Sequence, residues 1–158
     1  MKYLQNCFPA NKPENTMKKN HIEQIFDDYR MIAIIIYANY QKEGIEFFTP
    51  NNFSQQLAYM KRPKGFQIQA HVHKPVPRTV KYTQETLFIK KGKVKINFYD
   101  ELKNYLDNRI LKTGDVILLV SGGHDFFMLE DTEMIEVKQG PYAGDDDKEK
   151  FNSKNDSE

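Results

Sequence analysis

The sequence has few of the residues that mark secreted, metal-ribbon or membrane proteins. Cys7 is the single cysteine, so neither an internal disulfide nor a cysteine-rich zinc module can form. We therefore expect a reducing, cytoplasmic location. Residues 1–20 have no apolar stretch typical of a signal peptide. The longest apolar run, 31–38, is too short to span a bilayer, and no membrane association is expected.

An excess of one charge is also missing. The chain has 23 Lys and Arg against 22 Asp and Glu. This balance argues against nucleic acid or an anionic membrane as a partner. Aromatic residues, by contrast, make up 13% of the 158 residues, which favours a strand-rich single domain.

The hydrophobic pattern predicts many short strands separated by glycine, proline and asparagine turns, as in a sandwich or barrel. One short helix is expected over 21–29, capped by Asn20. Residues 1–20 are expected to be poorly ordered, 21–142 to form one domain and 143–158 to be a mobile charged tail. The expected strands span 31–37, 44–49, 57–61, 66–73, 85–90, 93–99, 109–112, 116–120, 124–129 and 134–138.

Three of the four histidines occupy positions that suit a metal site. His71 and His73 are two residues apart on an expected strand, so both imidazoles leave the same face. His124 follows a pair of glycines, and Glu85 begins a strand after a proline-rich loop. These four side chains form a mixed nitrogen and oxygen ligand set for one divalent metal. Fe, Mn, Ni, Cu and Zn all fit it.

The same residues carry a family resemblance. Gly65-x5-His71-x-His73 with Glu85-x6-Gly92 resembles the first motif of the cupin superfamily. Gly114-Asp115 with Gly122-Gly123-His124 resembles the second, and the likeness covers roughly residues 45–140. It implies an all-β double-stranded β-helix, or jelly-roll barrel, with the metal near one mouth.

The chain departs from the motifs at several points. The loop between His73 and Glu85 has eleven residues, more than the motif usually has, and leaves Gln84 as an alternative to Glu85. Val120 stands in place of a proline, the spacing from Gly114 to His124 is one residue short, and Met128 replaces an asparagine.

The segment 136–142, followed by Asp146 and Lys148, resembles the C-terminal part of small cupin-fold metalloproteins encoded among bacterial surface-polysaccharide genes. This likeness implies a small polar ligand such as a sugar derivative. Gln67 and Gln69, on the histidine face, and Arg78, on the loop, are candidates for binding it. An ordinary solvated loop explains Arg78 equally well, and the two glutamines could simply satisfy neighbouring polar groups.

The opposite face of the expected strand 66–73 is apolar, with Phe66, Ile68, Ala70 and Val72. A second subunit or the strand 31–37 would have to cover it, and we expect a homodimer.

Three functions remain open from the sequence. The first is a metal-dependent enzyme, an isomerase or a dioxygenase, acting on a small polar metabolite. The second is a metal-free sugar-nucleotide isomerase or epimerase with His71 or His73 as the general base. The third is a non-catalytic ligand sensor.

Overall fold

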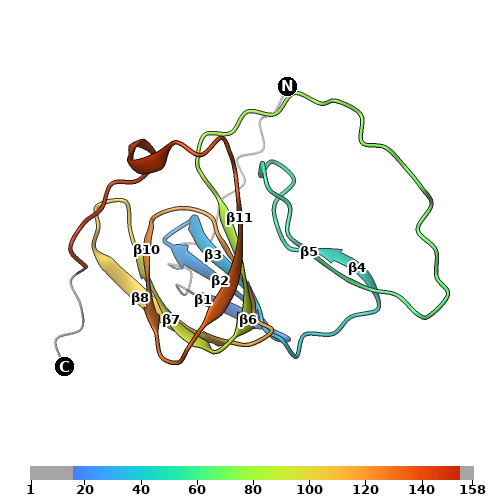
Figure 1. Ribbon diagram of the computed structural model, residues 1–158, viewed down its shortest axis with the longest axis horizontal. Coiled ribbons are helices and arrows are strands. Elements are labelled where there is room, and N and C mark those ends of the chain that lie inside the picture. The colour runs from blue at the N-terminus through green and yellow to red at the C-terminus, as the bar shows by residue number, and fades with distance from the viewer. Residues whose placement is uncertain (1–15, 154–158) are drawn as a thin grey trace, which may run out of the picture.

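The computed structural model describes residues 16–153, and these form an all-β protein in antiparallel sheets (Figure 1). A six-stranded sheet has the order β1-β2-β3-β9-β6-β11, and a three-stranded sheet has the order β10-β7-β8. A separate hairpin pairs β4 with β5. The strands are β1 Thr16–Lys19, β2 Ile22–Asp27, β3 Arg30–Ile36, β4 Gly44–Phe47, β5 Ala58–Lys61, β6 Glu85–Lys91, β7 Lys93–Tyr99, β8 Tyr105–Lys112, β9 Val116–Leu119, β10 Gly123–Met128 and β11 Glu133–Lys138.

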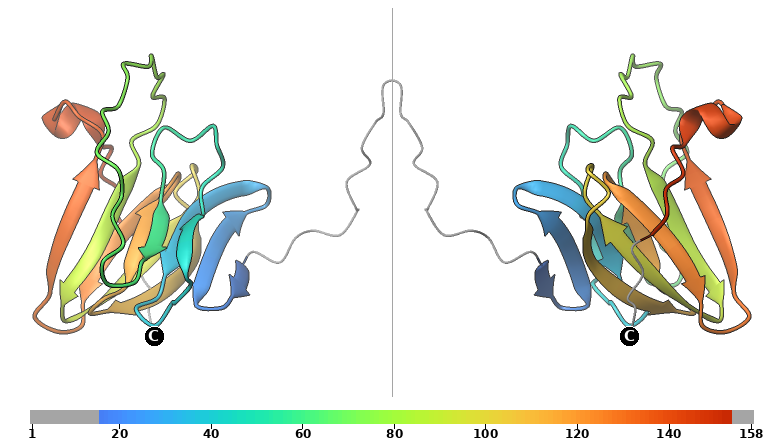
Figure 2. Two further views of the ribbon diagram at one scale, coloured as in Figure 1. Left: turned by 90° about the vertical axis from the view of Figure 1, so that its right-hand side faces the viewer. Right: turned by 90° about the vertical axis from the view of Figure 1, so that its left-hand side faces the viewer.

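The main core lies between the two larger sheets (Figure 2). Alternate side chains of β6, β7 and β9 point into it, among them Leu87, Ile96 and Ile117. A second cluster, centred on Ile34 and Leu118, lies under the segment that carries β4 and β5. The predicted strands of the second half of the chain are thus confirmed, because their alternating apolar residues have two sheets to pack between.

The predicted N-terminal helix over 21–29 is wrong. Residues 22–27 form β2, which pairs with β1 on one side and β3 on the other. Asn20 and His21 both have positive φ angles, and so does Asp28. Such backbone conformations belong to the tight turns of β-hairpins, which Asn and Asp tolerate well. Residues 22–27 therefore form a strand between two hairpin turns, although the spacing of Ile22, Ile25 and Phe26 is typical of a helix.

The predicted strand over 66–73 is not formed either. Residues 66–84 have no regular secondary structure, and every residue from 60 to 83 is exposed. We call residues 62–84 the arm. It leaves β5, swings outward beyond the hairpin β4–β5 and returns to β6 (Figure 1). The alternation of polar and apolar residues over 66–73 is typical of a strand. Within the described residues, however, no neighbouring strand pairs with this segment.

The ends of the described chain both lie against the sheets. Strand β1 covers 16–19, within the part expected to be poorly ordered, while residues 1–15 lie outside the described residues. The C-terminal segment contains a short 3-10 helix, Gly144–Asp147. Beyond it, the Phe151 ring lies 5.2 Å from the Tyr99 ring, so this part of the expected mobile tail packs on the end of β7. Across residues 16–153 there is no helix with the length and apolar character needed to cross a membrane.

Candidate functional site

Glu85 and His124 face each other across the two larger sheets. Glu85 begins β6 in the six-stranded sheet, and His124 lies near the start of β10 in the three-stranded sheet. The carboxylate Oε2 is 3.1 Å from His124 Nε2, and only 5% of Glu85 is exposed. The two residues lie 39 positions apart in the sequence (124 − 85), so the pair exists only because the sheets pack together.

The turn before β10 sets the position of His124. Gly122 has a φ of +72°, a left-handed conformation that favours glycine. A Cβ atom there would lie 2.4 Å from the carbonyl oxygen of Tyr99 on β7. The turn thus passes directly over the end of β7, which places His124 beside Phe98 in the strand register. A glycine here is required by both the backbone conformation and the close approach.

Two lysines complete the surroundings of the Glu85 carboxylate. Lys138 Nζ, from the end of β11, and Lys148 Nζ, from the C-terminal segment, each lie 3.8 Å from Glu85 Oε1. The hydrogen bond from His124 and the positive charges around it hold the pKa of Glu85 below its usual value, although burial alone would raise it. Glu85 is therefore a carboxylate at neutral pH.

The pKa of Lys138 is raised, so its side chain is charged at neutral pH. Burial acts to lower its pKa, but the negative charges of Glu85 and Glu136 outweigh this effect and raise it. Its ammonium group also lies over the ring of Tyr142, 5.7 Å from the centroid. The site thus contains a carboxylate with an imidazole on one oxygen and two ammonium groups on the other.

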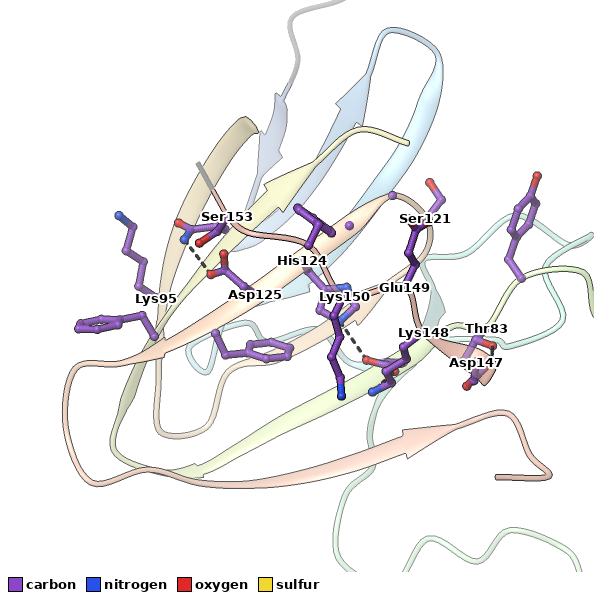
Figure 3. A pocket seen from close by; sticks show the side chains of 18 of the residues that line it. Thr83, Lys95, Ser121, His124, Asp125, Asp147, Lys148, Glu149, Lys150 and Ser153 are labelled. Carbon is purple, nitrogen blue, oxygen red and sulfur yellow. Dashed lines mark hydrogen bonds and ion pairs between the residues drawn. The ribbon is translucent and has the colours of Figure 1, made fainter. Parts of the chain in front are cut away.

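A cavity of about 1140 Å³ opens beside this pair (Figure 3). Its lining includes His124 and Phe126 from one face of β10, and Asp125 and Phe127 from the other face. Because successive side chains of a strand point to opposite faces, the cavity wraps around the strand's free edge. Four lysines and four acidic residues also line it, so the lining is polar and balanced in charge and suits a small polar ligand; they are Lys81, Lys95, Lys148, Lys150, Glu85, Asp125, Asp147 and Glu149.

On the outer face of β10, Asp125 is held by neighbouring polar groups. It accepts hydrogen bonds from Asn97 Nδ2 at 2.8 Å and from the Tyr99 hydroxyl at 2.5 Å. Burial and the bond to Asp125 raise the pKa of Tyr99 to about 12, so the hydroxyl stays protonated as a donor. This network braces β10 and β7 against each other, and its role is structural.

The structure brings together two of the four predicted metal ligands. His71 and His73 lie on the exposed arm with their ring centroids 5.2 Å apart, and His71 Nδ1 is 2.9 Å from the carbonyl oxygen of Gln69. Within residues 16–153, no group of three or more potential metal-ligating side chains is assembled. The candidate ligands are therefore divided between the two larger sheets, which carry Glu85 and His124, and the arm, which carries His71 and His73.

The choice between Glu85 and Gln84 is clear in this geometry. Gln84 is buried on the other side of the strand, where its Oε1 accepts a 3.3 Å hydrogen bond from the backbone amide of Gln55. Of the predicted ligand-binding residues, Gln67, Gln69 and Arg78 are all exposed on the arm and do not line the cavity. Arg78 Nη1 donates to the carbonyl oxygen of Val76.

Lys138 and Lys148 are the site residues that the sequence reasoning missed. Both belong to the C-terminal stretch whose pattern resembles that of cupin-fold metalloproteins. This resemblance drew attention to the stretch, but it did not predict that either lysine approaches Glu85. Their approach to Glu85 depends on the pairing of β11 with β6, which places Lys138 opposite Glu85.

Comparison with protein-family models, with curated proteins and with solved structures found no match for this chain. Function must therefore be inferred from the site itself.

Proposed function

We propose that this chain is a metal-binding cupin, a jelly-roll protein whose Glu85, His124, His71 and His73 hold one divalent transition metal. The observation that carries the proposal is the 3.1 Å approach of Glu85 to His124 beside a large cavity. The cupin-like spacing around both residues supports it, and so does the antiparallel two-sheet architecture.

The donor chemistry of the chain fits such a metal. An ionised carboxylate and an imidazole meet at the cavity, and two further imidazoles lie on one arm at a spacing that allows them to bind one cation. The lysines near Glu85 balance its charge and would move away from it when a cation binds. A bound divalent metal would polarise a carbonyl or activate water or oxygen.

The polar lining of the cavity supports a small polar metabolite as the ligand, such as a sugar derivative. Lys148 and Lys150 can bind carboxylate or phosphate oxygens as charged donors, while Phe126 and Phe127 offer apolar surface. In this role, Lys148 would exchange the Glu85 carboxylate for the ligand. We propose enzymatic turnover of such a ligand, in the cytoplasm.

Elemental analysis of the purified protein tests the metal assignment. The wild type should contain up to one divalent transition metal per chain after reconstitution with Mn, Fe, Ni, Cu or Zn in turn. His124→Ala and His73→Ala should each lose it, whereas the matched control His21→Ala should retain it, because His21 lies at the turn between β1 and β2. Absence of metal from the reconstituted wild type would refute the proposal.

A metal-free general base is the second candidate, favoured by the same contact. Glu85 orients His124 through the hydrogen bond at Nε2, an arrangement that suits proton transfer in an isomerase or epimerase. The base would then be His124 rather than His71 or His73. Turnover of a nucleotide-linked sugar that survives exhaustive chelation, but is lost in His124→Gln, would establish this alternative.

A further inference from the structure

The C-terminal segment forms a large part of the wall of the cavity. After the 3-10 helix Gly144–Asp147, the chain turns back and passes over the three-stranded sheet (Figure 2). Figure 3 shows Lys148 and Lys150 beside His124. The lining residues that this segment supplies are Asp147, Lys148, Glu149, Lys150, Phe151 and Ser153. We call residues 144–153 the lid.

One aromatic side chain seats the lid on the three-stranded sheet. The Phe151 ring packs edge-on against the Tyr99 ring, with centroids 5.2 Å apart. Gly123, at the start of β10, leaves room for it: a Cβ atom at this position would lie 3.0 Å from Phe151 Cζ. The φ angle of Gly123 is not positive, so its backbone conformation does not call for glycine. The space left by this glycine therefore holds the Phe151 ring.

The other contacts of the lid are polar and lie at the surface. Lys103 Nζ forms an ion pair with the carboxylate of Glu149, and the Thr83 hydroxyl donates a 3.2 Å hydrogen bond to Asp147 Oδ1. Residues 146–150 are all exposed. Exposed ion pairs contribute little to stability, and segments with few buried apolar contacts open locally at small cost. The lid is thus attached by one ring and by weak polar contacts.

Lys148 connects the position of the lid to the chemistry of the cavity. Its Nζ lies 3.8 Å from Glu85 Oε1, and its side chain is 49% exposed although Glu85 is buried. The ammonium group therefore reaches inward from the surface to the carboxylate oxygen that His124 leaves open. A cation approaching the same oxygen would be repelled by this ammonium group. Cation binding at Glu85 and a closed lid consequently oppose each other.

We propose that residues 144–153 are an autoinhibitory lid. It is closed when Phe151 is seated beside Gly123 and Lys148 contacts Glu85, and it opens when a cation or a polar ligand displaces Lys148. The lid itself requires no metal, and only a metal ion as the trigger rests on the proposed function. Because linkage is reciprocal, a change that opens the lid must strengthen cation binding at Glu85. Phe151 thus acts on the site through Lys148, as a positioning residue.

Histidine modification tests the lid in the metal-free protein. Diethyl pyrocarbonate modifies histidine, and peptide mass spectrometry gives the rate at each site, with the exposed His21 as the reference in the same molecule. Phe151→Ala and Gly123→Ala should each raise the rate at His124, relative to His21, by about threefold or more, because both unseat the ring. Tyr29→Ala removes a 76% exposed ring at the turn between β2 and β3 and should leave the ratio unchanged.

Two results of this experiment would overturn the lid. One is a wild-type His124 that reacts as fast as His21, because a closed lid must protect it. The other is an unchanged ratio in the lid variants, with circular dichroism showing that they are folded. Gly123→Ala disturbs the seat from β10 and Phe151→Ala disturbs it from the lid, so a folding defect in one variant leaves the other as the test.

Calorimetric titration with Zn²⁺ tests the connection between the lid and Glu85. Phe151→Ala should bind Zn²⁺ more tightly than the wild type by about threefold or more, since it withdraws the Lys148 charge. Lys148→Met should tighten binding as well, and adding Phe151→Ala to it should then change little. Weaker binding in Phe151→Ala, or the same gain with and without Lys148, would overturn the connection. If the wild type binds no Zn²⁺, the proposed function fails, while the His124 modification rates still decide whether the lid exists.

Discussion

Glu85 and His124 make a direct contact between two sheets, with the carboxylate Oε2 3.1 Å from the imidazole Nε2. The carboxylate is buried, and Lys138 and Lys148 approach its second oxygen. A buried carboxylate is stable only when charged or hydrogen-bonding partners compensate for its lost hydration. The contact therefore links the stability of the fold to the chemistry of the cavity.

Glu85→Gln should destabilise the metal-free protein in a pH-dependent way. The pKa of Glu85 is lowered in the folded state, so its stabilisation is fully present above the ordinary value of 4.5 and is lost as the pH falls through the folded pKa. We expect a loss of about 1–3 kcal/mol at neutral pH, because the substitution replaces a buried carboxylate that is bonded to His124 by a neutral amide. Urea unfolding across a pH series measures the difference.

The control for this prediction is Glu133→Gln on β11, which removes an exposed pair with Lys90. Such surface pairs contribute little. A Glu85→Gln effect that stays constant from neutral to strongly acidic pH would contradict the assignment of Glu85 as the titrating carboxylate.

Lys138→Met should change the affinities for cations and for anions in opposite directions. The ammonium group lies 3.8 Å from Glu85, so its removal leaves more negative potential for a divalent cation. We expect cation affinity to rise by about tenfold or less. Binding of an anionic ligand such as inorganic phosphate should weaken. Titration calorimetry with each probe measures both.

Lys90→Met is the matched control, since Lys90 pairs with Glu133 on the exposed surface of β6 and β11. Neither affinity should change in it. If Lys138→Met instead weakens cation binding, the lysine supports the cation site rather than competing with it.

Gly122→Ala should destabilise the fold more than Gly65→Ala. Both glycines have positive φ angles, which cost an alanine about 1–2 kcal/mol. Only at Gly122 would the new Cβ also approach a carbonyl oxygen, that of Tyr99 at 2.4 Å; at Gly65 it would lie in open space. The additional overpacking should contribute about 1–3 kcal/mol.

Thermal unfolding of the two variants measures this difference, and the metal content of Gly122→Ala reports whether His124 has moved. Equal loss of stability in both variants would mean that the turn over Tyr99 relaxes without cost.

The local sequence pattern was sufficient to predict most strands. Alternating apolar residues mark β6 and β7, with Gly92 at the turn between them, and the apolar run of β9 marks a buried strand. Local spacing misled at 21–29, where a helical arrangement of three apolar residues coincides with hairpin turns at both ends. The positive φ angles of Asn20 and Asp28 are properties of those turns, and the residue types alone do not demand them.

The sequence by itself determined the strand-rich class and the glycine turns, because alternation and turn chemistry depend on neighbouring residues. The motif spacing named Glu85 and His124 as candidate ligands but left Gln84 as an alternative. Only the tertiary structure decided that Glu85 rather than Gln84 faces His124, that Lys138 and Lys148 approach the carboxylate, and that the arm extends away from β10. The physical reason is that the alternation of side chains between the two faces of a strand is a local property of the backbone. The partner of each strand, by contrast, depends on contacts between distant parts of the chain.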